Sequence, residues 1–144
     1  MQIRRLREED AAEVAAIEAA TFSEPWSLES FIKEANEEDH IYLVAEGDDS
    51  SILGYCGCWI VACEGQIYNV AVKESERGRG LGKKLMESLI TECESRGVTA
   101  FTLEVRAGNE PAKALYHSLG FTDAGVRKNF YELPTEDAII MWRN

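Results

Sequence analysis

Hydrophobic and polar residues follow two periodicities along this chain, and these predict where strands and helices lie. Strand patterns are expected at residues 2–6, 40–46, 51–63, 66–72, 100–106, 121–133 and 137–143. Helix patterns are expected at residues 8–20, 28–37, 81–96 and 110–119. The predicted order is strand, two helices, three strands, helix, strand, helix and two strands, which indicates an α/β sheet covered by helices.

Residues that favour turns and helix caps separate these segments. Ser27 precedes the second helix and can cap it, and Asn109 can cap the fourth. Residues 47–50, Gly-Asp-Asp-Ser, lie between two strand patterns and are typical of a hairpin turn. We expect Gly65 to turn the chain into the next strand and Gly97 to end the long helix.

Length and composition fit a single domain that spans residues 1–144. The shares of 45% hydrophobic and 28% charged residues are ordinary for a globular protein. Residues 1–20 lack the apolar stretch of a secretory signal, and no segment approaches the roughly 20 apolar residues of a membrane helix. We therefore expect a cytoplasmic protein with no membrane partner, and the oligomeric state stays open.

The four cysteines and two histidines form no pattern typical of a disulfide framework or a metal site. Without a secretory signal, free thiols are the expected state of the cysteines. We expect Cys56, Cys58 and Cys63 to pack in the interior, and we expect no metal.

Charge is distributed unevenly. The net charge of −11 argues against nucleic acid as a partner, because phosphate backbones attract Lys and Arg. Residues 73–84 nevertheless hold five basic residues against two acidic ones, together with Gly78, Gly80 and Gly82. Glycines let the backbone approach a ligand, and the free amides of a helix start attract phosphate. We expect a pyrophosphate site here, and the alternative is a plain glycine-rich turn that starts a helix.

The spacing of these glycines matches neither a Walker loop nor a Rossmann loop. The segment RGRGLG at 77–82 resembles the acetyl-CoA motif of the Gcn5-related N-acetyltransferases, the GNAT superfamily. Further fragments, in the same order along the chain, resemble its ribosomal-protein-alanine N-acetyltransferases, the RimI family. These fragments are PWS at 25–27, NVAV at 69–72, LEVRAGN at 103–109, ALY at 114–116, GF at 120–121 and EDAIIM at 136–141.

Two positions depart from the pattern of that family. Gly108 stands where serine is common, which is expected to loosen its loop, and Phe130 replaces the first of two tyrosines. Both departures bear on the choice of acceptor more than on acetyl-CoA chemistry.

The resemblance implies the GNAT fold, in which a mixed, mostly antiparallel sheet of about seven strands is flanked by about four helices. It implies acetyl-CoA as the co-substrate. It assigns acetyl-CoA binding to Val70, Ala71, Val72, Arg77, Gly78, Arg79, Gly80, Leu81, Gly82, Lys83 and Asn109. Trp26 and Tyr131 are expected to border the acceptor, with packing in the interior as the alternative role of each.

The resemblance also implies that Glu104 is the general base and Tyr116 the general acid. Glu104 alternates with apolar neighbours near the end of a strand, where open α/β sheets place their ligands. Tyr116 follows the core position Leu115 and lies at the edge of its helix's apolar stripe. The alternatives are an ion pair between Glu104 and Arg106, and a tyrosine that only packs in the core.

Proton chemistry favours an N-terminal amine as the acceptor. The ordinary pKa is about 7.8 for an α-amine and about 10.4 for a lysine amine, so a carboxylate deprotonates the α-amine at a lower cost. We expect transfer of an acetyl group to a protein N-terminus, with alanine of a ribosomal protein as the implied acceptor. The alternatives are a lysine or small-amine acetyltransferase of the same fold, and a non-catalytic acetyl-CoA-binding module.

Overall fold

The computed structural model describes residues 1–144 and contains one seven-stranded sheet, in the order β1-β2-β3-β4-β5-β7-β6. The strands are β1 (Gln2–Arg5), β2 (His40–Glu46), β3 (Ile52–Val61), β4 (Glu64–Val72), β5 (Ala100–Arg106), β6 (Thr122–Tyr131) and β7 (Glu136–Arg143). Only β4 and β5 pair in parallel, and every other neighbouring pair is antiparallel. The predicted mixed, mostly antiparallel sheet is confirmed.

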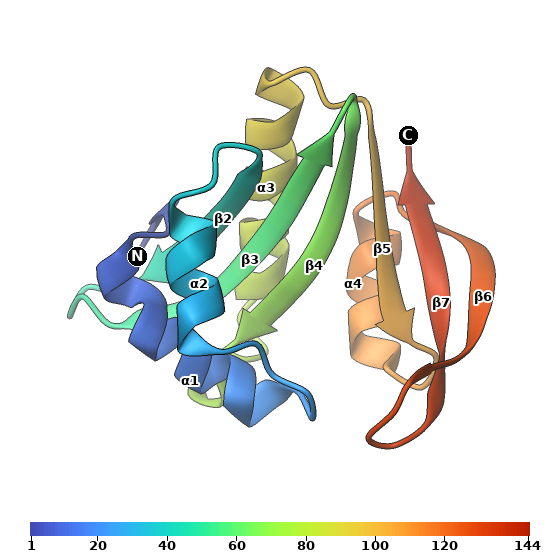
Figure 1. The fold of residues 1–144 in the computed structure, drawn as a ribbon, viewed down its shortest axis with the longest axis horizontal. Helices are drawn as coiled ribbons and strands as arrows, with labels where there is room; N and C mark the ends of the chain where they lie inside the picture. The colour runs from blue at the N-terminus through green and yellow to red at the C-terminus, as the bar shows by residue number, and fades with distance from the viewer.

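Helices cover both faces of this sheet (Figure 1). They are α1 (Ala11–Thr21), α2 (Leu28–Ala35), α3 (Leu81–Ser95) and α4 (Glu110–Ser118), with short 3-10 turns η1 (Glu8–Asp10) and η2 (Glu74–Glu76). One apolar core lies between the sheet and α1 and α2, and a larger one lies beneath α3. None of the helices combines the length and the apolar character that crossing a bilayer requires.

The predicted caps and turns are confirmed, with one exception. Ser27 accepts a hydrogen bond from Ser30 N at 3.2 Å at the start of α2, and Asn109 accepts one from Ala112 N at 3.2 Å at the start of α4. Gly97 follows α3 with a φ of 90°, a left-handed conformation that suits glycine.

The exception is Gly65, which was expected to form a turn. It lies inside β4, and the turn falls earlier, around Ala62, whose φ is 54°. A Cβ at Gly65 would lie 2.8 Å from Cδ1 of Phe101 on β5. Gly65 therefore allows β4 and β5 to approach closely, which is a common reason for a glycine inside a strand.

The cysteines are free, as expected. Cys56 and Cys58 are buried on one side of β3 within the larger core. The expectation that Cys63 is buried is wrong, because the residue lies in the β3–β4 turn and is exposed.

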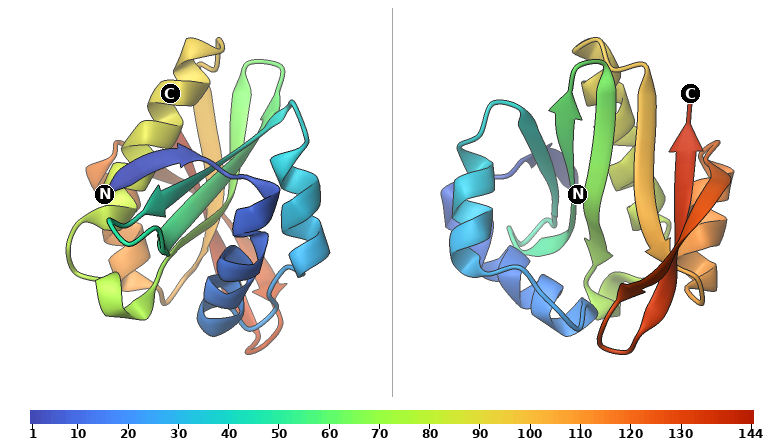
Figure 2. Two further views of the ribbon diagram at one scale, coloured as in Figure 1. Left: turned by 90° about the vertical axis from the view of Figure 1, so that its left-hand side faces the viewer. Right: turned by 45° about the vertical axis from the view of Figure 1, so that its right-hand side comes forward.

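The parallel strands β4 and β5 separate soon after they meet. Their pairing covers only residues 64–66 of β4 and 100–102 of β5, and Figures 1 and 2 show the two strands diverging beyond it. On its other side β4 contains a bulge, because Asn69 pairs with Gly57 and Ile67 pairs with Cys58, leaving Tyr68 without a partner. The later parts of β4 and β5 therefore face each other unpaired. We call this region the β4–β5 divergence.

Candidate active site

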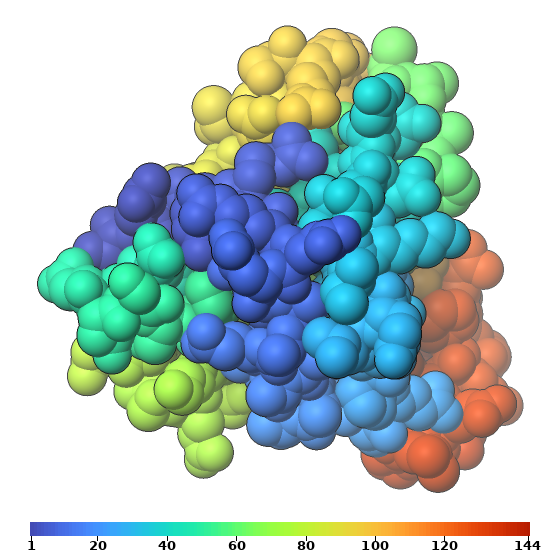
Figure 3. Space-filling view, turned by 60° about the vertical axis from the view of Figure 1, so that its left-hand side comes forward, coloured from blue at the N-terminus to red at the C-terminus, as the bar shows by residue number.

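Two segments far apart in sequence meet beside the β4–β5 divergence. They are the α1–α2 connection and the β6–β7 hairpin, which lie side by side in the space-filling view (Figure 3). The Arg106 guanidinium joins them: it donates to Ser23 Oγ at 3.2 Å on one side, and to Pro134 O at 2.9 Å and Leu133 O at 3.4 Å on the other. Arg106 therefore fixes two segments that border the end of β5.

The glycine loop before α3 has the backbone expected of an anion site. Gly78 and Gly80 have φ values of 80° and 77°, in the left-handed region that costs other residues about 1–2 kcal/mol. A Cβ at either position would meet no atom within 4 Å, so the space beside the loop is open. Gly80 precedes α3, and no side chain caps the first turn of that helix. Its amides are therefore free to bind a phosphate.

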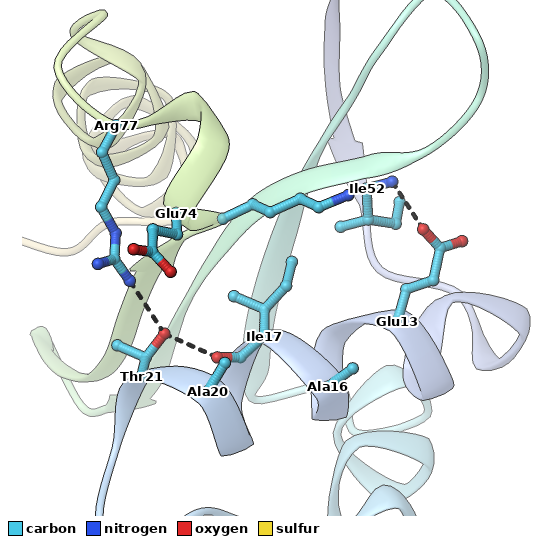
Figure 4. A pocket seen from close by; sticks show the side chains of 9 residues that line it. Glu13, Ala16, Ile17, Ala20, Thr21, Ile52, Glu74 and Arg77 are labelled. Atoms are coloured by element: carbon cyan, nitrogen blue, oxygen red, sulfur yellow. Dashed lines mark hydrogen bonds between the residues drawn. The ribbon is translucent and has the colours of Figure 1, made fainter.

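The cations of this loop have different roles. Arg77 Nε donates to Val72 O at 3.0 Å, and a terminal nitrogen of Arg77 donates to Thr21 Oγ1 at 3.4 Å. Figure 4 shows this side chain pointing toward α1, where it lines a cavity of about 270 Å³. Arg79, in contrast, is largely exposed and contacts only Glu76, at 3.6 Å. Arg79 is thus free to meet a ligand, whereas the Arg77 side chain connects β4 to α1.

A buried hydrogen-bond network supports the first part of the divergence. The Glu18 carboxylate, only 2% exposed, accepts hydrogen bonds from Trp26 N at 2.9 Å, from Asn69 Nδ2 at 3.1 and 3.2 Å, and from the Tyr55 hydroxyl. Asn69 Oδ1 in turn accepts from the Tyr42 hydroxyl at 2.7 Å. The network joins α1, the α1–α2 connection and β4 next to the bulge.

Sequence reasoning missed this network, although one signal was present. Glu18 follows Ile17 and lies four residues after Val14, so it falls on the apolar side of α1. A charged residue on the buried face of a helix needs partners from other elements. Only the tertiary structure identifies them.

Glu104 lies where the strand pattern placed it. Leu103 and Val105 are buried, and Glu104 points to the opposite face, with its side chain 33% exposed. Its ion-pair partner is not Arg106, which pairs with Glu136 at 3.2 Å, but Arg127 of β6, whose Nε lies 3.3 Å from Glu104 Oε1. The alternative interpretation, a pair between Glu104 and Arg106, is therefore wrong.

Aromatic residues surround this carboxylate. Burial, followed by the charge of Glu104, raises the pKa of Tyr131 to about 12, and the same two causes raise the pKa of Tyr68. The Trp26 ring lies 6.1 Å from the Tyr68 ring, and Arg106 Cζ lies 4.4 Å from the centre of the Tyr131 ring. Tyr131 thus belongs to the surroundings of Glu104, whereas the Trp26 ring packs between Tyr68 and the smaller core, 5.8 Å from the Phe31 ring.

Tyr116 combines a packed ring with an open hydroxyl. The residue is 8% exposed, and its ring lies 6.0 Å from that of Phe121. The hydroxyl has no hydrogen-bond partner, yet the only fully buried side-chain nitrogen or oxygen atom without a partner is Arg4 Nε. The Tyr116 oxygen therefore reaches the surface. Burial, followed by Tyr131, raises its pKa, so the hydroxyl keeps its proton at neutral pH.

Glu136 contacts the loop that follows β5. Gly108 N donates to Glu136 Oε2 at 2.6 Å, and Glu136 also pairs with Arg106. A backbone N–H bond of this kind forms at any residue, so the expectation that Gly108 loosens the loop stays a prediction. A Cβ at this position would lie 2.8 Å from Glu136 Oε2, so a serine would displace this carboxylate.

Comparisons with known proteins agree with this geometry. Residues 11–121 match the model of the acetyltransferase (GNAT) family. A chain of Bacillus subtilis (strain 168) is 40% identical over 140 residues, which cover 97% of this chain and 93% of that one. The [ribosomal protein bS18]-alanine N-acetyltransferase of Salmonella typhimurium is 42% identical over 129 residues, 87% of this chain and 84% of that protein.

Solved structures lead to the same group. The crystal structure of the ribosomal-protein-S18-alanine N-acetyltransferase from Escherichia coli is similar with a TM-score of 0.89 and 35% identity. The match covers 99% of this chain and 92% of that one. Because the family model matches well over half of the sequence and the fold agrees throughout, the chain belongs to the GNAT family of acetyltransferases.

Proposed function

We propose that this protein transfers the acetyl group of acetyl-CoA to the N-terminal α-amine of a protein, with the alanine of ribosomal protein bS18 as the acceptor. The observation that carries the proposal is the Glu104 carboxylate, which is accessible beside the β4–β5 divergence and surrounded by aromatic residues. The names of the relatives in Salmonella typhimurium and Escherichia coli support the choice of acceptor. Such an acceptor places the reaction in the cytoplasm.

The residues between β4 and α3 fit the co-substrate. The open backbone of Gly78 and Gly80 and the uncapped start of α3 suit its pyrophosphate, and Arg79 and the exposed Lys83 add positive charge. Residues 70–72 of β4 lack a partner strand on the β5 side, so their outward-facing backbone groups can hold the pantetheine arm. Asn109 caps α4 with its side-chain oxygen, Oδ1. Its side-chain nitrogen, Nδ2, is therefore left to contact the co-substrate.

The proposed reaction is a direct transfer. The amine nitrogen attacks the thioester carbonyl carbon, a C–N bond forms, and the C–S bond breaks. Glu104 takes one proton from the acceptor's ammonium before the attack. Tyr116 gives a proton to the departing sulfur and regains the second proton that the nitrogen loses, so that the products are an amide, a free thiol and one proton released to solvent. Backbone amides of β4 stabilise the negative charge that develops on the carbonyl oxygen. Tyr116 is protonated at neutral pH and is therefore available to donate, while the burial that raises its pKa makes complete proton transfer to the sulfur more uphill.

The surroundings of Glu104 suit a peptide acceptor. Trp26 and Tyr131 are proposed to border the peptide, because the Trp26 ring lies beside Tyr68, and the charge of Glu104 raises the pKa values of Tyr68 and Tyr131. The net charge of −11 favours a basic acceptor such as the tail of a ribosomal protein.

Mass spectrometry tests the proposal directly. The protein is incubated with acetyl-CoA and with peptides that begin with Ala, Ser or Met, alongside an N-terminally blocked peptide that carries an internal Lys. We expect acetyl groups on the free α-amines, with the alanine peptide preferred. Acetylation confined to Lys would contradict the N-terminal assignment, and binding of acetyl-CoA without any product would indicate a binding module.

Glu104→Gln tests the role of the general base. We expect its turnover to fall by about 100-fold or more, because general bases typically contribute a factor of 10² to 10⁴. Its affinity for acetyl-CoA, measured by calorimetry, should stay at the wild-type value. Affinity lost together with turnover would contradict the assignment of Glu104.

A further inference from the structure

Arg127 of β6 has a single polar partner in the chain, and that partner is Glu104. Arg127 Nε lies 3.3 Å from Glu104 Oε1, and the Arg127 side chain is 56% exposed. Its Cζ also lies 5.9 Å from the centre of the Phe130 ring. An ion pair with this much exposure contributes little stability and can exchange its partner.

The other arginine of this region differs in this respect. Arg106 contacts Ser23, Pro134, Glu136 and the Tyr131 ring, and its side chain is only 26% exposed. Arg106 is therefore held in place by several segments at once. Arg127 is the cation beside Glu104 that can leave without breaking the fold.

The strand register explains why Arg127 reaches Glu104. Across β7, Glu104 pairs with Ile140 and Arg127 pairs with Ala138, two residues along, so both side chains lie on the same face of the sheet. A bulge follows Arg127. Arg127 pairs with Ala138, and the next pair is Tyr131 with Glu136, so residues 128–130 lie opposite Asp137 alone. Asn129 in this bulge has a φ of 53° and donates its N–H to Asp137 Oδ1 at 2.9 Å. The fold thus places the guanidinium beside the proposed base.

An acceptor amine must interact with the same carboxylate. With an ordinary pKa of about 7.8, a protein's α-amine is mostly an ammonium at neutral pH. We propose that Arg127 pairs with Glu104 in the free protein and that the acceptor's ammonium displaces it. Arg127 is then a residue that determines acceptor specificity. The proposal rests on the proposed function, because it requires Glu104 to receive the amine.

This exchange keeps the carboxylate paired with a cation throughout, so no uncompensated charge arises. The displaced guanidinium can rest over the Phe130 ring, which already lies within cation–π distance. Tyr68 of β4 and Tyr131 of β6, whose pKa values the charge of Glu104 raises, are both neutral at this pH, and Arg106 on the same face of β5 is paired with Glu136. An acceptor without a positive charge cannot replace Arg127 in the same way.

Steady-state kinetics of Arg127→Gln test the proposal, with Lys128→Gln as the matched control. Lys128 is the next residue of β6, is exposed and makes no ion pair, so both variants lose one positive charge from the same strand. With an alanine-initiated peptide, the KM of Arg127→Gln for the peptide should fall about two- to fivefold, the range that exposed ion pairs support. Lys128→Gln and the conservative Arg127→Lys should keep the wild-type KM.

Two further measurements separate competition from a merely structural role. Added salt should reduce the difference in KM, since exposed pairs are screened. The acetylated product peptide has no ammonium and should inhibit the wild-type protein and Arg127→Gln equally. A higher KM or a lower kcat in Arg127→Gln would overturn the proposal, because Arg127 would then hold Glu104 or the acceptor in place.

Failure of the proposed function is distinguishable from failure of this inference. If the wild-type protein acetylates only lysine side chains, the N-terminal assignment fails. The KM of Arg127→Gln and of the wild-type protein can still be compared with that lysine acceptor. A lower KM in the variant supports displacement of Arg127, and a higher KM overturns it.

Discussion

Replacing Glu18 with alanine removes the acceptor at the centre of the buried network beside β4. Three donors then lose their partner: the backbone N–H of Trp26, the Tyr55 hydroxyl and the Asn69 side-chain amide. An unsatisfied buried donor costs about 1–3 kcal/mol, and the Tyr55 hydroxyl can rotate to limit its share. We therefore expect Glu18→Ala to lower the free energy of unfolding by about 3–6 kcal/mol, a large part of the 5–15 kcal/mol typical of a domain.

Glu18→Gln provides the matched control. The glutamine oxygen can still accept from Trp26 N and from Asn69 Nδ2, as Glu18 Oε2 does, while its amide nitrogen donates to the Tyr55 oxygen. Asn69 Oδ1 then still accepts from the Tyr42 hydroxyl, and only the Tyr55 O–H loses its acceptor. The glutamine variant should therefore lose less than about 2 kcal/mol.

Urea unfolding followed by tryptophan fluorescence measures both variants. The difference should appear as a shift of the midpoint at constant slope, which reports a change in stability alone. Equal losses in Glu18→Ala and Glu18→Gln would refute the reasoning, because the negative charge and not the hydrogen bonds would then matter. Losses below 1 kcal/mol in both would show that the network contributes little.

Two other predictions concern the site. Tyr116→Phe should lower kcat with little change in the KM for acetyl-CoA or for the peptide. Because burial raises the Tyr116 pKa, the pH profile of kcat for the wild-type protein should show no loss of the general acid below about pH 10. A loss of activity near pH 8 would contradict this. Gly80→Ala should weaken acetyl-CoA binding in calorimetry by about 5- to 30-fold. The reason is that the φ of 77° at position 80 costs alanine about 1–2 kcal/mol. Unchanged affinity would exclude the loop as the phosphate site.

Local sequence patterns predicted the elements of this fold well. The strands at 40–46 and 100–106 were predicted at their observed bounds, and Ser27 and Asn109 cap the helices they were expected to cap. These features depend on residues a few positions apart, whose periodicity and backbone preferences act locally. Gly65 was misinterpreted because a glycine signals equally a turn or a close approach of strands, and only Phe101 across the sheet distinguishes the two.

The sequence by itself determined the order of the elements, the open glycine loop before α3 and the outward face of β5 that carries Glu104. The tertiary structure decided which side chains meet there: Glu18 beneath β4, the Arg77 side chain toward α1, and Arg127 instead of Arg106 at Glu104. Each of these contacts joins residues more than 20 positions apart in the sequence. Such pairings follow from strand order, register and the packing of α1 on the sheet, which decide which side chains meet only after the sheet has assembled.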